Sequence, residues 1–146
     1  DMDTAIYHHE KAIEICPSDT YHISRYAILN VYIGNPEKGL EQVKKAMRID
    51  PFCSDLMLEV EGICHYWLKN FSDALSSFKK IKIDTRDSLF YSAATAKSMN
   101  LVSDANNFLN QAKLVSKMTI EKFVDSQPYK NIDEKNSLKK ILTSIS

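Results

Sequence analysis

Apolar residues recur along the chain three or four positions apart, and polar residues fill the positions between them. This spacing places the apolar side chains on one face of an α-helix and predicts an all-α fold. The helices are expected at residues 2–15, 20–33, 36–49, 54–69, 71–83, 86–99, 102–116, 119–126 and 133–144. Pro36 falls in the first turn of its helix, where a missing N–H removes no hydrogen bond. Residues 127–132 form the longest connector that is not helical.

The helical pattern repeats itself with a period of about 34 residues. At corresponding positions of successive repeats, small residues match small residues, apolar residues match apolar residues, and a proline matches a proline. The matching residues are Ala5, Ala12 and Pro17, then Gly39, Ala46 and Pro51, then Ala74 and Phe78, then Ala105, Leu109 and Ala112. Two antiparallel helices with two short turns use about 34 residues, and neither helix buries its apolar stripe alone. The pairs must therefore stack, which predicts an α-solenoid.

The repeat resembles the tetratricopeptide repeat (TPR) family. The residues that carry the resemblance are Ala27, Gly34, Gly39, Ala46 and Pro51 in one repeat, Gly62, Tyr66, Phe71, Ala74 and Phe78 in the next, and Ala93, Ala96, Ala105 and Ala112 in the third. The resemblance implies a right-handed superhelical stack of helix-turn-helix units. It divides a single domain, residues 1–146, into a partial repeat (2–17), three repeats (20–51, 54–84 and 86–117) and C-terminal capping helices (119–146).

A narrower resemblance runs from Pro51 to the last helix. The runs Ile49–Phe52, Phe71–Ala74 and Phe123–Asn131 are similar to the repeat region that follows bacterial class III adenylate/guanylate cyclase domains, where a Gln-Pro-Tyr-Lys segment precedes a last helix. This implies a bacterial nucleotide cyclase as the parent protein. A transcription regulator with a sensory TPR domain is the alternative. Because helical signal begins at Asp1, we expect a piece of a longer protein.

Composition and charge exclude several classes of function. The 19 basic residues equal the 19 acidic ones, so the chain lacks the net positive charge that drives binding to nucleic acid or to anionic membranes. No run of about 18 apolar residues predicts a membrane span, and no signal peptide is recognised. The three cysteines have no tight spacing, which favours a reducing compartment and a cytoplasmic location.

No group of residues predicts catalysis, a metal or a cofactor. His8 and His9 are adjacent and point in different directions on a helix, so they cannot share a metal ion. Cys64 and His65 have no second pair at ligand spacing. The three glycines form no phosphate-binding loop, and no nucleophile elbow is present. We therefore expect a domain that is not an enzyme.

The first helix of each repeat lines the concave groove in the TPR family. By this resemblance the candidate protein-binding residues are Tyr21, Ser24, Ile28, Val31 and Tyr32, then Leu56, Glu59, Ile63, Tyr66 and Trp67, then Asp87, Phe90, Ala94, Lys97 and Ser98. Aromatic residues in a groove suit the anchoring of a partner segment. The alternative is that Tyr66 and Trp67 pack between neighbouring helices.

The expected function is that of a non-catalytic protein-interaction or scaffold module. The partner is a protein, a peptide or another part of the same chain. Homo-oligomers are also expected, because the first predicted helix lacks a paired helix. The Lys, Asn and Arg pattern of the family's carboxylate clamp is missing, so a receptor for chaperone C-termini is not expected.

Overall fold

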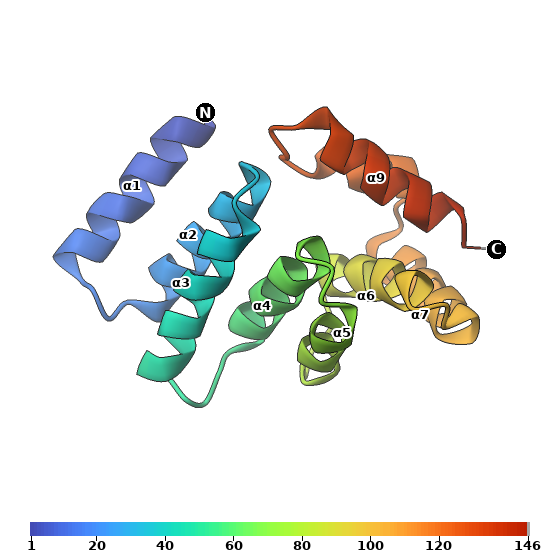
Figure 1. Cartoon of the computed structure of the whole chain (residues 1–146), viewed down its shortest axis with the longest axis horizontal. Helices are drawn as coiled ribbons and strands as arrows, with labels where there is room; N and C mark the ends of the chain where they lie inside the picture. The colour runs from blue at the N-terminus through green and yellow to red at the C-terminus, as the bar shows by residue number, and fades with distance from the viewer. Residues whose placement is uncertain (146) are drawn as a thin grey trace.

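The computed structural model describes residues 1–145 and arranges them as α-helices joined by short turns, with no strand among them (Figure 1). The helices are α1 (Met2–Ile15), α2 (Thr20–Tyr32), α3 (Pro36–Ile49), α4 (Asp55–Trp67), α5 (Phe71–Lys79), α6 (Arg86–Ser98), α7 (Val102–Ser116), α8 (Ile120–Ser126) and α9 (Ile132–Thr143). The predicted all-α fold is confirmed. Ser146, the last residue of the predicted cap, lies outside the described residues.

Neighbouring helices form pairs that stack side by side. α2 packs against α3, α4 against α5, and α6 against α7, and α1 packs against α2. The first helices of the pairs, α2, α4 and α6, also contact one another in sequence order. Figure 1 shows the resulting row of antiparallel rods. Each of α2–α6 thus buries its apolar stripe against its own partner and against a neighbouring pair, as the solenoid predicted from the repeat requires, whereas α1 contains no buried residue.

Small residues stand where helices of a pair cross closely. A Cβ added at Gly39 on α3 would lie 2.8 Å from the backbone oxygen of Ala27 on α2. A Cβ at Gly62 on α4 would lie 2.5 Å from the ring of Phe78 on α5. Ala46 and Ala74 are completely buried at related crossings. Larger side chains there would force the helices apart, so the recurrent small residues set the spacing of the stack.

The turn inside each pair repeats one backbone motif. Gly34, Lys69 and Asn100 have positive φ angles of 91°, 61° and 59°, each two residues beyond the end of a first helix. The following amides donate to carbonyls one turn back in the helix, at 2.8–2.9 Å, in the pairs Asn35–Asn30, Asn70–His65 and Leu101–Ala96. This Schellman motif ends the helix and reverses the chain within three residues. It explains the regular period.

One helix boundary differs from the sequence prediction by more than two residues. The helix expected over 71–83 ends at Lys79. The amides of Lys82 and Ile83 donate 3.0 Å hydrogen bonds to the carboxylate of Asp55, at the start of α4, instead of continuing the helix. The end of α5 is therefore set by a contact with the preceding helix.

The last two helices do not extend the row as a further pair. α9 packs against α6 and α8, and it lies above the α6–α7 end of the row (Figure 1). The connector before it, Gln127–Asn131, reaches the N-terminal repeats, where the Lys130 amide donates a 2.9 Å hydrogen bond to the Tyr32 carbonyl. This return brings residues from both ends of the chain to the face formed by α2, α4 and α6.

Candidate functional site

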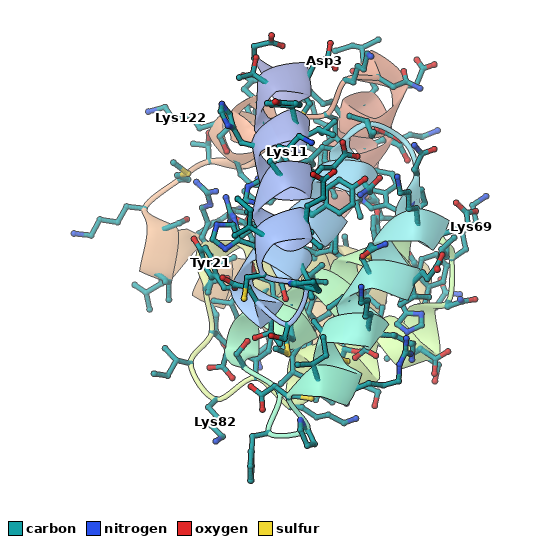
Figure 2. All side chains as sticks on the ribbon, turned by 90° about the vertical axis from the view of Figure 1, so that its left-hand side faces the viewer. Asp3, Lys11, Tyr21, Lys69, Lys82 and Lys122 are labelled. Atoms are coloured by element: carbon teal, nitrogen blue, oxygen red, sulfur yellow. The ribbon has the colours of Figure 1, made fainter. Side chains whose placement is uncertain are left out.

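The predicted groove residues lie at different depths. Tyr21 is 59% exposed and lies at the surface in the view from the α1 end (Figure 2). Tyr32, Leu56, Glu59, Trp67, Asp87, Lys97 and Ser98 are partly buried. Ser24, Ile28, Val31, Ile63, Tyr66, Phe90 and Ala94 are buried. The buried residues hold the helices together in this structure and do not line an open groove.

Neighbouring aromatic rings cover two of these residues, Phe90 and Tyr66. The ring of Phe90 stacks on the ring of Phe123 from α8, with 4.0 Å between centroids. Tyr66 makes edge contacts with Trp67 and Tyr91, at 5.1 and 5.6 Å between centroids. Repeat register places both residues on the first helices as expected, but packing against neighbouring helices removes them from the surface.

An aromatic pocket forms where the three first helices meet the connector. Tyr32 of α2, Trp67 of α4 and Tyr91 of α6 surround the side chain of Tyr129, which is 6% exposed. We call the site formed by Tyr32, Trp67 and Tyr91 the tyrosine pocket, because it encloses the side chain of a tyrosine. The Tyr129 ring meets the edges of Tyr32 and Trp67, each at 5.1 Å between centroids. Edge-to-face contacts of this kind stabilise aromatic pairs beyond the area that they bury.

The hydroxyl of Tyr129 is held by hydrogen bonds. Trp67 Nε1 donates to it at 2.6 Å, and the hydroxyl of Tyr91 also bonds with it. The Tyr91 hydroxyl lies 3.4 Å from Oε1 of Gln127, whose side chain is buried as well. Each repeat thus contributes one aromatic residue to the recognition of a single extended segment.

The pocket is electrically neutral at ordinary pH. Burial raises the pKa of Tyr32, Tyr91 and Tyr129 above the usual range of phenols, and the mutual proximity of Tyr91 and Tyr129 raises the pKa of Tyr91 further. The phenols of Tyr91 and Tyr129 therefore keep their protons and act as hydrogen-bond donors and acceptors.

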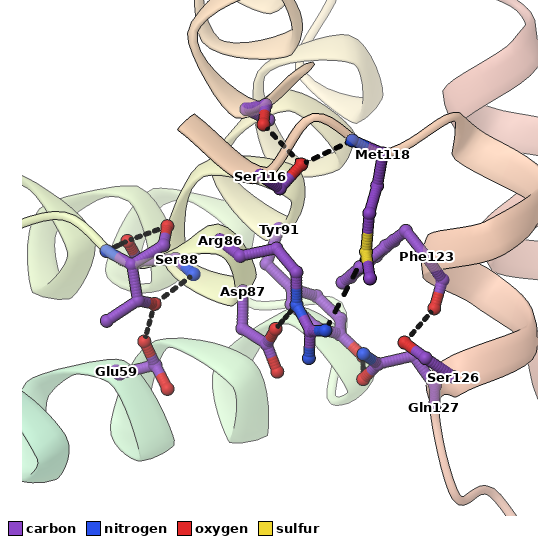
Figure 3. A network of polar contacts seen from close by, with 12 residues as sticks. Glu59, Arg86, Asp87, Ser88, Tyr91, Ser116, Met118, Phe123, Ser126 and Gln127 are labelled. Atoms are coloured by element: carbon purple, nitrogen blue, oxygen red, sulfur yellow. Dashed lines mark hydrogen bonds and ion pairs between the residues drawn. The ribbon is translucent and has the colours of Figure 1, made fainter. Parts of the chain in front are cut away.

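A polar region lies beside the pocket on α4 and α6 (Figure 3). Thr85 Oγ1 donates a hydrogen bond to Glu59, and Arg86 pairs with Asp87 at 2.6 Å between Nε and Oδ1. The Arg86 guanidinium also lies 5.7 Å from the centre of the Phe123 ring. Burial raises the pKa of Glu59, although the Thr85 hydrogen bond opposes the shift. This region offers both signs of charge to a polypeptide.

The described residues contain no group of three His, Cys, Asp or Glu side chains that could hold a metal ion. Cys16, Cys53 and Cys64 are unpaired. Burial raises the pKa of Cys64 to about 12, so its thiol stays protonated and unreactive. Within residues 1–145, no helix is both long and apolar enough to cross a membrane.

Sequence reasoning missed three residues of this site, namely Tyr91, Gln127 and Tyr129. Tyr91 falls outside the groove positions that the repeat register predicts, and Gln127 and Tyr129 belong to a connector for which the periodicity predicts only a lack of helix. The available signal was an aromatic residue after Pro128, since proline keeps the chain extended and presents neighbouring side chains.

Curated proteins match part of this sequence, and a solved structure matches almost all of its fold. No protein-family model matches the chain. It is 32% identical over 88 residues to the Protein SGT1 homolog of Homo sapiens, covering 58% of this chain and 24% of that protein. It is 31% identical over 78 residues to the homologue of Bos taurus, covering 53% and 23%. The chain thus matches about a quarter of the length of these curated relatives.

The crystal structure of MamA superposes with a TM-score of 0.68 over 98% of this chain and 85% of that chain, at 16% sequence identity. SGT1 homologues contain tetratricopeptide repeats, and MamA is a TPR-like solenoid. The matches support a TPR-type family. A TPR-type solenoid explains why α2, α4 and α6 share one face, because the first helices of successive repeats lie next to one another.

Proposed function

We propose that the chain is a non-catalytic protein-interaction module that holds extended polypeptide segments on the face formed by α2, α4 and α6. The observation that supports this most is the tyrosine pocket, in which one aromatic residue from each repeat closes around an extended segment of the same chain. TPR-like relatives suggest a protein-interaction scaffold as well. The surface that binds one such segment is chemically suited to others.

The same face continues beyond the pocket with accessible side chains. Tyr21 and Arg25 are exposed on α2, and Glu59 and Asp87 are partly exposed on α4 and α6. An exposed aromatic ring beside groups of both charges suits a polypeptide partner, because it offers one anchor and several hydrogen-bonding positions. The partner is another protein or another region of the same polypeptide.

Affinity enrichment with surface variants tests the proposal. The wild-type chain is compared with Tyr21→Ala/Arg25→Ala, which alters the concave face, and with Lys79→Ala/Lys80→Ala, which alters exposed lysines at the end of α5. All three chains must first show the same thermal unfolding. We expect at least one protein that the wild type and the lysine variant recover and the concave variant loses. Identical recovery by all three contradicts the proposal.

The connector sequence favours a second, wider candidate. The run Gln127–Lys130, which resembles the segment before the last helix of cyclase-associated repeats, precedes α9 here. On this basis the chain is a regulatory or dimerising tail of a nucleotide cyclase. The coding sequence upstream of Asp1 tests this. A mixed α/β domain with paired metal-binding aspartates supports the cyclase, whereas a DNA-binding domain favours a transcription regulator.

A further inference from the structure

The tyrosine pocket is built to recognise a hydroxyl as well as a ring. Trp67 Nε1 is a donor only, and its partner is the Tyr129 oxygen at 2.6 Å. The Tyr91 hydroxyl, on a completely buried residue, bonds with the same oxygen. A phenylalanine in the pocket would leave these groups without their shared partner. Sites that hydrogen-bond a hydroxyl discriminate strongly against analogues that lack it.

Alternate side chains of the segment are buried against the face. Gln127 and Tyr129 are buried, whereas Pro128 and Lys130 between and after them are exposed. The backbone at Gln127 is extended, with φ −75° and ψ 128°. The Lys130 amide bonds with the Tyr32 carbonyl. The two side chains that enter the face are thus two residues apart, with Pro128 between them, so the face accommodates the pattern Gln-Pro-Tyr.

A phosphorylated tyrosine does not fit this site. The hydrogen-bond partners of the Tyr129 hydroxyl are an indole and a phenol, and neither carries a charge. A phosphate there would place about two negative charges in a buried site without a cationic partner. The site therefore separates an unmodified tyrosine from a phosphotyrosine.

The helix that follows the segment is seated imperfectly. Oε2 of Glu134 on α9 is buried and has no hydrogen-bond partner among the described residues. A pocket of about 150 Å³ also remains between α9 and the repeats, lined by Tyr66, Trp67 and Ile141 among others. An unpaired buried carboxylate oxygen and unfilled space both weaken the attachment of α9. These features lie beside Leu138 and Leu142, which are completely buried and anchor the same helix.

We propose that the tyrosine pocket is a recognition site for an unmodified tyrosine in an extended Gln-Pro-Tyr-like segment of a partner protein. In the free chain Gln127–Asn131 occupies the site as an internal competitor, and the partner segment replaces it. This inference rests on the proposed function and names the chemistry of the partner. It also assigns the C-terminal connector a regulatory role, because its release opens the pocket.

A peptide titration with the full chain tests the inference. The peptide is acetyl-Asp-Ser-Gln-Pro-Tyr-Lys-Asn-amide, which copies residues 125–131. The variant Tyr129→Ala empties the pocket, and the fluorescence of Trp67, the single tryptophan, reports its filling. We expect the peptide to bind this variant at least about tenfold more tightly than the wild type. Versions of the peptide with phenylalanine or phosphotyrosine should bind about tenfold more weakly or not at all.

Controls make the result decisive. Tyr7→Ala, at an exposed position on α1, leaves the pocket filled and should behave like the wild type. If circular dichroism shows that Tyr129→Ala is unfolded, Tyr129→Leu replaces it, because leucine keeps apolar volume but leaves the hydroxyl partners Trp67 and Tyr91 free for the peptide. A folded variant whose Trp67 emission does not respond to the peptide overturns the proposal, as does equal binding of the three peptides.

The identity of the occupant is tested separately. Light scattering on a mixture of wild-type and Tyr129→Ala chains should give the same oligomeric state as either chain alone. A larger assembly that forms only in the mixture would assign the pocket to the C-terminal segment of a second copy and overturn the assignment to a partner protein. A failure of the proposed function shows up differently, in enrichment that is insensitive to the concave variant, so the two outcomes are distinguishable.

Discussion

Trp67 Nε1 donates a 2.6 Å hydrogen bond to the hydroxyl oxygen of Tyr129, although 62 residues separate the two along the chain. The contact joins the middle repeat to the connector before α9. Tyr32 and Tyr91 complete the surroundings of Tyr129, so residues of all three helix pairs depend on one side chain.

Tyr129→Phe should lower the free energy of unfolding by about 1–3 kcal/mol. The variant keeps the ring but leaves Trp67 Nε1 and the Tyr91 hydroxyl without their common partner, and unpaired buried polar groups carry this penalty. Urea denaturation followed by circular dichroism measures the change. The control Tyr21→Phe, at an exposed position, should stay within about 0.5 kcal/mol of the wild type. Equal stability of both variants contradicts the prediction.

Gly39→Ala should destabilise the chain by about 1–3 kcal/mol through overpacking. Its Cβ would lie 2.8 Å from the carbonyl oxygen of Ala27, a backbone atom that cannot rotate away. Alanine gains about 1 kcal/mol over glycine in helix propensity, so a more stable variant would show that α2 and α3 are less tightly packed than the structure indicates. Glu41→Ala, on the exposed side of the same helix, serves as the control for urea denaturation.

Asp55→Ala should loosen the turn that follows α5. The amides of Lys82 and Ile83 lose their 3.0 Å bonds to the carboxylate, and their hydrogen-exchange rates should rise about tenfold. Amides inside α4 and α6 should exchange as in the wild type. Asp104→Ala, on the exposed surface of α7, is the matched control. Unchanged exchange at Lys82 and Ile83 would mean that Asp55 does not determine the end of α5.

Stability should fall as the pH is lowered from about 7.5 to 5 because of His65. Burial lowers the pKa of this imidazole, and nearby Glu61 and Asp73 only partly oppose the shift. Its contribution to folding is therefore present above the ordinary histidine pKa of 6.5 and is lost as the pH falls toward the lower pKa of the folded state.

The measurement is urea denaturation at several pH values. His65→Asn should lose less stability over this interval than the wild type. His8→Asn, at an exposed position on α1, should follow the wild-type curve. If His65→Asn and the wild type show the same slope, protonation of His65 does not limit stability in acid.

The order and positions of the helices could be predicted from the sequence because local signals determine them. Pro36 begins a helix, Gly34 ends one, and small residues such as Gly39 mark the close crossings. The end of α5 could not be predicted in this way. The amides of Lys82 and Ile83 donate hydrogen bonds to Asp55, which lies 27 and 28 residues earlier in the chain. No local sequence pattern indicates a contact at that separation.

The candidate site was only partly predictable for a similar reason. Repeat register places Tyr32 and Trp67 on the correct helices and face. It does not predict how deeply each side chain is buried, because burial depends on the residues that pack over it, as Phe123 packs over Phe90. Tyr129 lies in a short connector without periodicity, and its contacts are set by the path of the chain after α8.

The resonance of the single indole N–H offers the most direct test that the first helices hold the chain's own connector. In a nuclear Overhauser spectrum of the wild-type chain, the Trp67 indole proton should show cross-peaks to the ring protons of Tyr129 and exchange slowly with water. An indole proton that exchanges rapidly and shows no cross-peak to Tyr129 would contradict the account.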